Sequence, residues 1–595
     1  MIPEKPLPYS DEFSSVEDYI EALLEYTSTT DMFQILCGGV HILDFFTTEP
    51  GLFKTIIPES WQPFLVACNP MDFLDVLLRD DLDSPITKDG AGSPPEDLVT
   101  FVRDVRRLSL RRSFVPKQGK LPVLPRQVAL GMNIKKVHEV TSFAGYVDRL
   151  MEDISTTYGQ EMTHLIDFGS GQNYLGRTLA SEPYNKHIIA VEGREENIAG
   201  AKNLDLLAGL AEKEKAMRNK KVYQQVLDQR TPKEKMSDRT LNRVAKPLDF
   251  APEVVAAADM RPIKDLELTY VQEQGKGYIH YVHDRLENAD MTSVIGKVKE
   301  DLLPGQEQDL RLMAISIHSC GNLSHFGIRS MVLNPDIRAV AIVGCCYNLM
   351  TEKLGPPTYK IPYMRPSLQA INGRVARESE KRDPQGFPMS QRLCKYKDGV
   401  RLNITARMMA CQAPENWTES DSQGFFVRHF YRAVLQKLFL DKGVINKIYH
   451  DKGEEADDQG NWSSTPFNTS TNPVIIGSLR KGCYTSFHAY VRGAIKKLTS
   501  NSEFVQYSRV VREKMGDITD EEISEYERAY GHRKNEIAAI WSLMAFCAGV
   551  VESLIVADRW LFLKEHTDLV QDCWAETVFD YKYSPRNLVV VGIKK

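Results

Sequence analysis

The residues best suited to chemistry in this sequence lie where two apolar runs end, near positions 167 and 192. The first run leads into Asp167, Gly169 and Gly171, and the next one, at 187–192, ends on Glu192. Glycines directly after a strand let the backbone turn tightly and approach a ligand, because they carry no Cβ. An acid at the end of the following strand can accept hydrogen bonds from both hydroxyls of a ribose. The spacing therefore predicts a cofactor site.

Two positions in this turn indicate which cofactor binds. The dinucleotide fingerprint places a third glycine three residues after the second, and Tyr174 stands there instead, so NAD is disfavoured. An acid two residues before the first glycine, as Asp167 is, is typical of S-adenosylmethionine (SAM) sites, where it helps to hold the cationic amino acid part of the cofactor. We therefore expect SAM, with Ser170 among the residues that bind it. The alternative is an ordinary strand–turn–helix whose glycines serve the turn alone.

The composition indicates an ordinary globular protein of more than one lobe. Of its residues, 42% are hydrophobic and 26% are charged, as in ordinary globular proteins. The length of 595 residues is too great for a single hydrophobic core. A net charge of −6 excludes an electrostatic nucleic-acid binder for the molecule as a whole, and no DNA partner is expected. Two local segments, 103–112 and 211–246, are rich in Lys and Arg. They either meet RNA phosphates or are solvated surfaces.

The sequence also bears on compartment and membrane. Its start is proline-rich and then acidic, unlike a signal peptide, so we expect the protein in the cytoplasm, with the nucleus as the alternative. The longest apolar stretch, 537–551, is shorter than a membrane span and predicts a buried helix, with no membrane partner. Ten cysteines in so long a chain are expected to be free thiols.

The order of candidate strands and helices predicts an α/β fold. Strand candidates alternate with helical stretches, which indicates a parallel sheet with covering helices. The last segments read as a β-hairpin that completes this sheet, and a polar loop is expected at 451–473. The strand candidates are 164–168, 187–192, 278–283, 312–317 and 338–343. The predicted parts are an N-terminal helical lobe (1–130), a core (131–358) with a charged insertion (211–260), a mainly helical insertion (359–572) and the hairpin (573–595).

Three cysteines follow two neighbouring strand candidates. The fourth strand leads to His318 and Cys320, and the fifth leads to Cys345 and Cys346. One imidazole and three thiols could bind zinc. We predict no metal, because adjacent residues of an extended chain point to opposite sides and no Cys-x₂-Cys pair is present. The cysteines are then expected to pack as small apolar side chains.

His318 is the candidate catalytic residue. An imidazole at a strand end can orient a substrate or take a proton near neutral pH. The alternative is a structural histidine that is hydrogen-bonded within the fold.

Eight short motifs occur in a fixed order along the chain. They span 132–139, 167–171, 318–324, 344–347, 386–390, 406–413, 558–565 and 584–587. Together these motifs resemble the methyltransferase-like protein 25 family of eukaryotic SAM-dependent methyltransferases. The motifs around Cys320 and Cys345 also resemble, more distantly, a family of tRNA 2′-O-methyltransferases. One departure is Asn173, which stands where the family more often has a third glycine, although Asn also tolerates left-handed backbone angles.

The resemblance implies a Rossmann-like, seven-stranded methyltransferase sheet. It also implies that Asp167, Gly169 and Gly171 surround the methionyl part of SAM, that Glu192 binds the ribose and that Asp284 contacts the adenine. The expected activity is methyl transfer to a macromolecular acceptor, either protein or RNA. The alternative is a SAM-binding or degenerate scaffold that acts through its helical lobes.

Overall fold

The structure is a computed structural model. It describes residues 2–39, 41–48, 51–82, 92–115, 122–214, 224, 268–270, 275–301, 310–355, 382–449 and 469–595. Most of the charged insertion and most of the polar loop at 451–473 lie outside the described residues.

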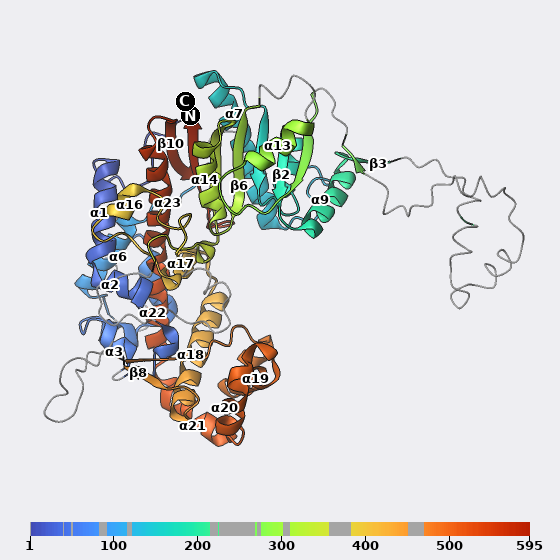
Figure 1. The fold of residues 1–595 in the computed structure, drawn as a ribbon. Helices are drawn as coiled ribbons and strands as arrows, with labels where there is room; N and C mark the ends of the chain where they lie inside the picture. The colour runs from blue at the N-terminus through green and yellow to red at the C-terminus, as the bar shows by residue number, and fades with distance from the viewer. Residues whose placement is uncertain are drawn as a thin grey trace, which may run out of the picture. The chain divides into compact units, whose positions relative to one another are not determined.

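A seven-stranded, mostly parallel sheet organises the fold, with the strand order β10-β11-β7-β6-β1-β2-β5 (Figure 1). The pairs β1–β6, β6–β7 and β2–β5 are parallel, whereas the C-terminal hairpin is antiparallel and joins the sheet through β11 and β7. The predicted α/β class with a seven-stranded, Rossmann-like sheet is therefore confirmed. The strands are β1 (His164–Phe168), β2 (His187–Glu192), β5 (Tyr278–His283), β6 (Leu312–Ser319), β7 (Ile337–Gly344), β10 (Val570–Thr577) and β11 (Leu588–Lys594).

The internal contacts of the chain divide it into two compact units. The larger unit contains 1–121, 145–169 and 286–595, and the smaller unit contains 122–144 and 170–285. The boundaries at 130, 358 and 572 that the sequence suggests stay predictions. The hairpin pairs with β7 through β11, and residues 548–565 of the insertion contact β10 and β11, so that these segments belong to the larger unit.

The N-terminal part of the larger unit is helical, as expected. The helix α1 begins after Ser15, whose hydroxyl accepts a hydrogen bond from the Asp18 N–H and so caps the helix. The elements of this part are α1 (Val16–Thr29), α2 (Asp31–Gln34), η1 (Ile35–Gly39), η2 (Ile42–Asp44), α3 (Leu52–Ile56), α4 (Gln62–Ala67), α5 (Pro70–Leu78) and α6 (Glu96–Leu108).

The remaining helices of the larger unit lie beside the strands and in the insertion before the hairpin. Those that accompany β5 to β7 are α13 (Thr292–Asp301), α14 (Leu323–Leu333) and η6 (Tyr347–Leu349). Those of the insertion are α16 (Gln391–Lys395), α17 (Ile404–Met409), η7 (Pro414–Asn416), α18 (Glu419–Asp441), η8 (Lys481–Tyr484), α19 (Phe487–Ser500), η9 (Ser502–Phe504), α20 (Val505–Met515), α21 (Asp520–Gly531), α22 (Lys534–Phe546) and α23 (Ala548–Glu565).

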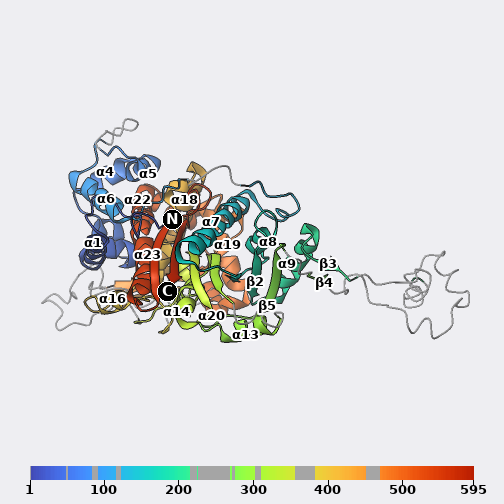
Figure 2. The ribbon, with the colours of Figure 1, turned by 90° about the horizontal axis from the view of Figure 1, so that it is seen from above.

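The stretch Lys534–Glu565, made of α22 and α23, is the core of the helical part. By length and composition alone it could cross a membrane, but 89% of its most apolar window is buried inside the protein. The helix α23 lies alongside the strand β10 in both views (Figures 1 and 2). The predicted buried helix at 537–551 is therefore confirmed, although it is split in two at Cys547.

One prediction for the insertion is wrong. Residues 469–471, which were expected to lie in a loop, form the strand β9 (Thr469–Thr471), which pairs antiparallel with β8 (Lys447–Tyr449). The hydroxyl of Thr471 also donates a hydrogen bond of 2.7 Å to the buried Asp44. A polar composition suggested a loop, but Thr is a good strand former when a partner strand is available.

The smaller unit carries two strands of the large sheet and their helices. Its further elements are α8 (Tyr174–Ala180), α9 (Glu195–Ala208) and the short pair β3 (Glu212–Lys213) and β4 (Leu268–Thr269). The long helix α7 (Ile134–Tyr158) begins in the smaller unit and ends in the larger one. A buried ion pair of 2.8 Å joins Arg177 of α8 to Asp205 of α9 and holds these two helices together.

Candidate functional site

The turn after β1 has the backbone conformation that the sequence predicts. Gly169 and Gly171 have φ angles of 67° and 58°, and Asn173 follows with φ 52° and ψ 41°. Asn173 therefore adopts the left-handed conformation of the glycine that the family more often has at this place, as its tolerance of positive φ suggested. A Cβ on Gly171 would meet nothing within 4 Å, so the space beside this residue is open.

The close packing of helix and strand beyond the turn depends on Gly176, which the sequence analysis missed. A Cβ at this position would lie 2.9 Å from Cγ2 of Ile188 in β2 and 2.1 Å from Oδ1 of Asn173. Tyr174 instead donates a hydrogen bond of 3.1 Å from its hydroxyl to the carbonyl of Gly131. The signal that could have found Gly176 is a glycine inside the first turn of a predicted helix, where only close packing repays its entropic cost.

Glu192 is held in place by three donors within the smaller unit. Its carboxylate accepts hydrogen bonds from the N–H of Gly171 (2.8 Å), the N–H of Arg194 (3.0 Å) and the amide of Asn197 (3.1 Å). The backbone N–H of Asp284 donates to the carbonyl of Glu192 at 3.2 Å. The fold therefore brings together Gly171, Glu192 and Asp284, three of the residues predicted to bind the cofactor.

The other predicted cofactor residues lie at the end of β1, in the larger unit. Asp167 is only 5% exposed. A Cβ on Gly169 would lie 2.8 Å from Cδ2 of Leu323, the first residue of α14, so that this helix begins directly against the turn. Glycine is thus needed here both for its φ angle and for space.

The site has the features that a SAM molecule requires of it. Open space lies beside Gly171, and a buried carboxylate faces the same turn. Among the residues that the structure describes, the buried hydroxyl oxygen of Ser170 has no hydrogen-bond partner. Such an orphaned polar atom is typical of a site whose ligand completes its hydrogen bonds.

His318 lies at the same edge of the sheet as the end of β1, because β1 and β6 are parallel. The Ser316 hydroxyl donates a hydrogen bond of 3.1 Å to the carbonyl of Phe168, the last residue of β1. The strand β6 continues beyond the end of β1, so that His318 lies two residues after Ser316 in β6. The next residue, Ser319, pairs with Gly344 of β7. The half-buried imidazole of His318 is therefore placed where parallel strands of a ligand-binding sheet end.

The thiols of Cys320, Cys345 and Cys346 form a cluster, which we call the thiol cluster. Their sulfur atoms are 3.3 Å apart for Cys320 and Cys345, 3.4 Å for Cys320 and Cys346 and 3.5 Å for Cys345 and Cys346. The geometric premise of the sequence analysis is wrong here, because β7 ends at Gly344 and the two adjacent cysteines lie in a turn, not in extended chain. Both thiols can then face the same side.

The turns that carry the thiol cluster are tied together through their backbones. The N–H of Gly321 donates a hydrogen bond of 3.2 Å to the carbonyl of Cys346. Gly321 has a φ angle of 59°, and a Cβ on it would lie 2.6 Å from the carbonyl oxygen of Leu349. The side-chain amide of Asn322 donates to the hydroxyl of Thr351 (2.6 Å), and so fastens the turn after β6 to the segment after η6.

Two of the later motifs, 386–390 and 558–565, lie in the insertion and are hydrogen-bonded to each other. The buried carboxylate of Asp558 in α23 accepts hydrogen bonds from the N–H groups of Met389 (2.7 Å) and Ser390 (2.9 Å). Glu565, two turns further along α23, accepts from the first two N–H groups of α16. Two motifs that are more than 160 residues apart in the sequence are thus one structural unit.

The arginine-rich segment 103–112 is largely engaged within the protein. Arg106 donates to carbonyls at the end of α5, and Arg107 pairs with Asp104. Arg111 and Arg112 form ion pairs with Asp11 and Glu552 at 2.6 Å. These contacts favour a structural role for the segment over binding of RNA phosphates. Residues 215–246, and with them all the basic residues of this range, lie outside the described residues apart from Gln224.

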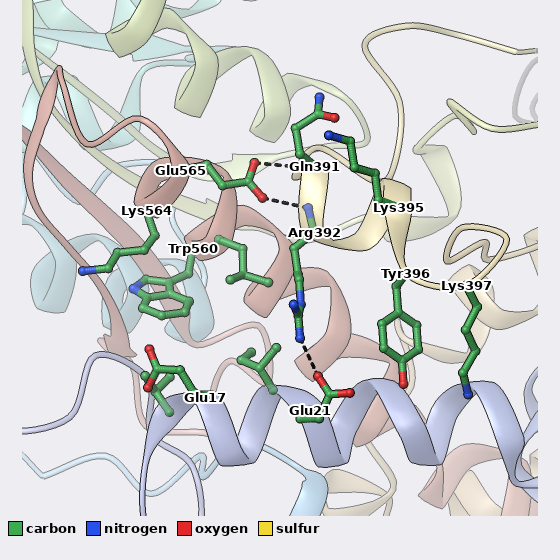
Figure 3. A pocket seen from close by; sticks show the side chains of 13 residues that line it. Glu17, Glu21, Gln391, Arg392, Lys395, Tyr396, Lys397, Trp560, Lys564 and Glu565 are labelled. Carbon is green, nitrogen blue, oxygen red and sulfur yellow. Dashed lines mark hydrogen bonds and ion pairs between the residues drawn. The ribbon is translucent and has the colours of Figure 1, made fainter.

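A cavity of about 740 Å³ in the larger unit lies among α1, α16 and α23 (Figure 3). None of the predicted cofactor or catalytic residues lines it. Figure 3 shows that Arg392 in this cavity pairs with Glu21, at 2.5 Å, and that Glu565 accepts two backbone hydrogen bonds. We therefore do not assign the cofactor to it.

Comparisons with known proteins agree with this geometry. Residues 135–353 match the family model of a methyltransferase domain, and this range contains every predicted cofactor residue, His318 and the thiol cluster. The chain is 26% identical to the human probable methyltransferase-like protein 25 over 530 residues, which are 78% of this chain and 75% of the human protein. It is 26% identical to the mouse protein of that name over 354 residues, 58% of this chain and 48% of the mouse protein. No solved structure gives a significant match.

The fold and the matched domain define a methyltransferase. Over most of its length the chain is similar to the methyltransferase-like protein 25 of human and mouse.

Proposed function

We propose that this methyltransferase uses SAM and transfers its methyl group to a macromolecular acceptor, protein or RNA. The observation that carries the proposal is the contact of the Glu192 carboxylate with the N–H of Gly171. It fixes an acid at the end of β2 against an open glycine turn, the arrangement that suits a ribose beside the turn. The proposed binding residues are Asp167, Gly169, Ser170, Gly171, Glu192 and Asp284.

The three donors to Glu192 leave part of its hydrogen-bonding capacity for a ligand. An ionised carboxylate offers about four lone-pair sites, and three are used within the protein. The remaining capacity faces the turn and can accept from a ribose hydroxyl. Because the carboxylate is already oriented, binding does not have to order its side chain.

SAM supplies an electrophilic methyl group, so the protein has mainly to align the acceptor with it. We assign His318 to the acceptor, either to position it or to remove its proton. The thiols and the imidazole at the ends of β6 and β7 then lie on the acceptor side of the site. The alternative is a SAM-binding or degenerate scaffold, and the conformation of the glycine turn and the placement of Glu192 count against the degenerate form.

Glu192→Ala should weaken SAM binding about tenfold or more, because lost ribose hydrogen bonds cost over about 1 kcal/mol. Titration calorimetry on the full chain measures this directly. Glu196→Ala is the matched control, since Glu196 is an exposed glutamate in the first turn of α9, four residues after Glu192, and its loss should leave the affinity unchanged. A thermal melt without SAM checks that both variants fold. Equal affinity in the Glu192 variant and the wild type would refute the assignment of the cofactor to this turn.

A further inference from the structure

The thiol cluster has the dimensions of a metal site. Zinc binds thiolates at about 2.3 Å in a tetrahedron, which places two ligating sulfurs about 3.8 Å apart. The three sulfur–sulfur distances here, 3.3, 3.4 and 3.5 Å, need only a few tenths of an ångström of expansion to reach this value. Three uncharged thiols have no strong attraction that would gather them, since the S–H group is a weak donor.

The backbone fixes the cluster from two sides, which a preformed metal site requires. The hydrogen bond from Gly321 to Cys346 joins the two turns, and the Cys346 carbonyl also accepts from the N–H of Leu349 at 3.0 Å. Cys320 is exposed, whereas Cys345 and Cys346 are partly buried, so an ion can enter from the Cys320 side. The geometry does not depend on the placement of one flexible side chain.

The contacts within the cluster converge on the sulfur of Cys346. The thiols of both Cys320 and Cys345 donate hydrogen bonds to the sulfur of Cys346, at 3.4 and 3.5 Å. The guanidinium of Arg586 lies 6.0 Å from the ring of Tyr347, the residue directly after Cys346. A thiolate is the form of cysteine that ligates metals.

A second guanidinium lies close to the cluster. Arg559 of α23 is fully buried, and a Cβ on Gly344, directly before Cys345, would lie 2.3 Å from its Nη1. Three thiolates and a divalent ion carry a net charge of −1. The positive charges of Arg559 and Arg586 near the cluster offset this charge in a partly buried place.

We propose that Cys320, Cys345 and Cys346 bind one zinc ion, with water in the fourth position. Soft thiolate ligands in tetrahedral arrangement select zinc over harder divalent ions. Among the described residues, no further His, Cys, Asp or Glu offers a ligand atom within 4.8 Å of all three sulfurs. Three protein ligands with an open fourth position distinguish such a site from a closed structural one.

Two nearby side chains, Cys411 and His318, could be considered as a fourth ligand. Cys411 directs its thiol toward Oδ1 of Asn348 at 3.5 Å and the carbonyl of Cys345 at 3.8 Å, so it is engaged beside the cluster and not in it. His318 lies two residues before Cys320 but is not a member of the cluster. We therefore expect Cys411→Ser and His318→Ala proteins to retain the ion.

The test is the metal content of the purified full chain, measured by mass spectrometry after gel filtration without chelator. We expect about one zinc per chain in the wild type and in Cys483→Ser, a control cysteine outside the cluster, and a loss to background in Cys345→Ser and Cys346→Ser. X-ray absorption at the zinc edge should show three sulfurs at about 2.3 Å and one oxygen or nitrogen at about 2.0–2.2 Å.

Any result that differs from these expectations overturns the proposal. A wild-type protein without zinc, whether its thiols are free or joined in a disulfide, removes the site, and this measurement needs no variant to fold. Iron or copper in place of zinc refutes the identity of the ion. Four sulfurs, or loss of zinc from the Cys411 or His318 variant, refutes the open position. Because metal content does not require SAM, the result is independent of the proposed methyl transfer.

Discussion

A His318→Ala protein should lose methyl transfer by about 100-fold or more while it keeps its fold and its affinity for SAM. The reason is the place of the imidazole at the end of β6, two residues beyond the level at which β1 ends. It lies at the ligand-binding edge of the sheet but outside the glycine turn and the Glu192 contacts that we assign to the cofactor. Removing it should therefore affect the acceptor step alone.

Three measurements on this variant separate the roles that the histidine could have. Methyl transfer gives the activity, calorimetry gives the SAM affinity, and a thermal melt gives the stability. His532→Ala, on an exposed helix end, is the matched control and should behave like the wild type. Near wild-type activity in the His318 variant would return this residue to a structural role. A loss of SAM affinity would instead make it part of the cofactor site.

Glu552→Ala should destabilise the larger unit by about 3–5 kcal/mol, the usual cost of leaving buried charges without their partner. The carboxylate is 3% exposed, and it accepts a hydrogen bond of 2.7 Å from the hydroxyl of Tyr347. It also forms ion pairs of 2.6 Å with Arg112 and Arg586. The loss would leave two guanidinium groups facing each other across a small cavity.

This effect should appear as a lower midpoint of thermal unfolding. Glu552→Gln keeps the shape of the side chain and should cost less, because the amide oxygen can still accept one hydrogen bond. Glu525→Ala changes an exposed glutamate on α21 and should stay within about 0.5 kcal/mol of the wild type. A Glu552→Ala protein that melts like this control would show that α23 does not join the N-terminal lobe to the hairpin through this carboxylate.

The parts of the fold that could be predicted from the sequence are those with local causes. Apolar runs that end in turn residues gave β1, β2, β5, β6 and β7, because strand periodicity and glycine placement are readable within ten residues. The left-handed conformation of Asn173 was predictable for the same reason, since it depends on the residue type and its place in the turn. The strand β9 was not, because it depends on a partner strand some twenty residues away.

The thiol cluster shows the limit of reading side-chain directions from sequence. The rule that neighbours point to opposite sides applies inside a strand, and β7 ends one residue before Cys345. The predicted strand, 338–343, also ended before the cysteines, so the error lay in treating the residues after the strand as extended chain. The contacts of Asp558 with Met389 and of Glu552 with Arg112 could not be predicted either, because these residues are more than 160 positions apart in the sequence.

The most direct test of the central claim is the transfer of tritium from methyl-labelled SAM. The purified protein is incubated with an extract of cells that lack it, and the products are divided into RNA and protein by nuclease and protease treatment. We predict label in one of these fractions, absent with heat-treated protein and reduced with Glu192→Ala and His318→Ala. Label in neither fraction, from a protein that binds SAM in calorimetry, would contradict the proposed activity and favour a SAM-binding scaffold.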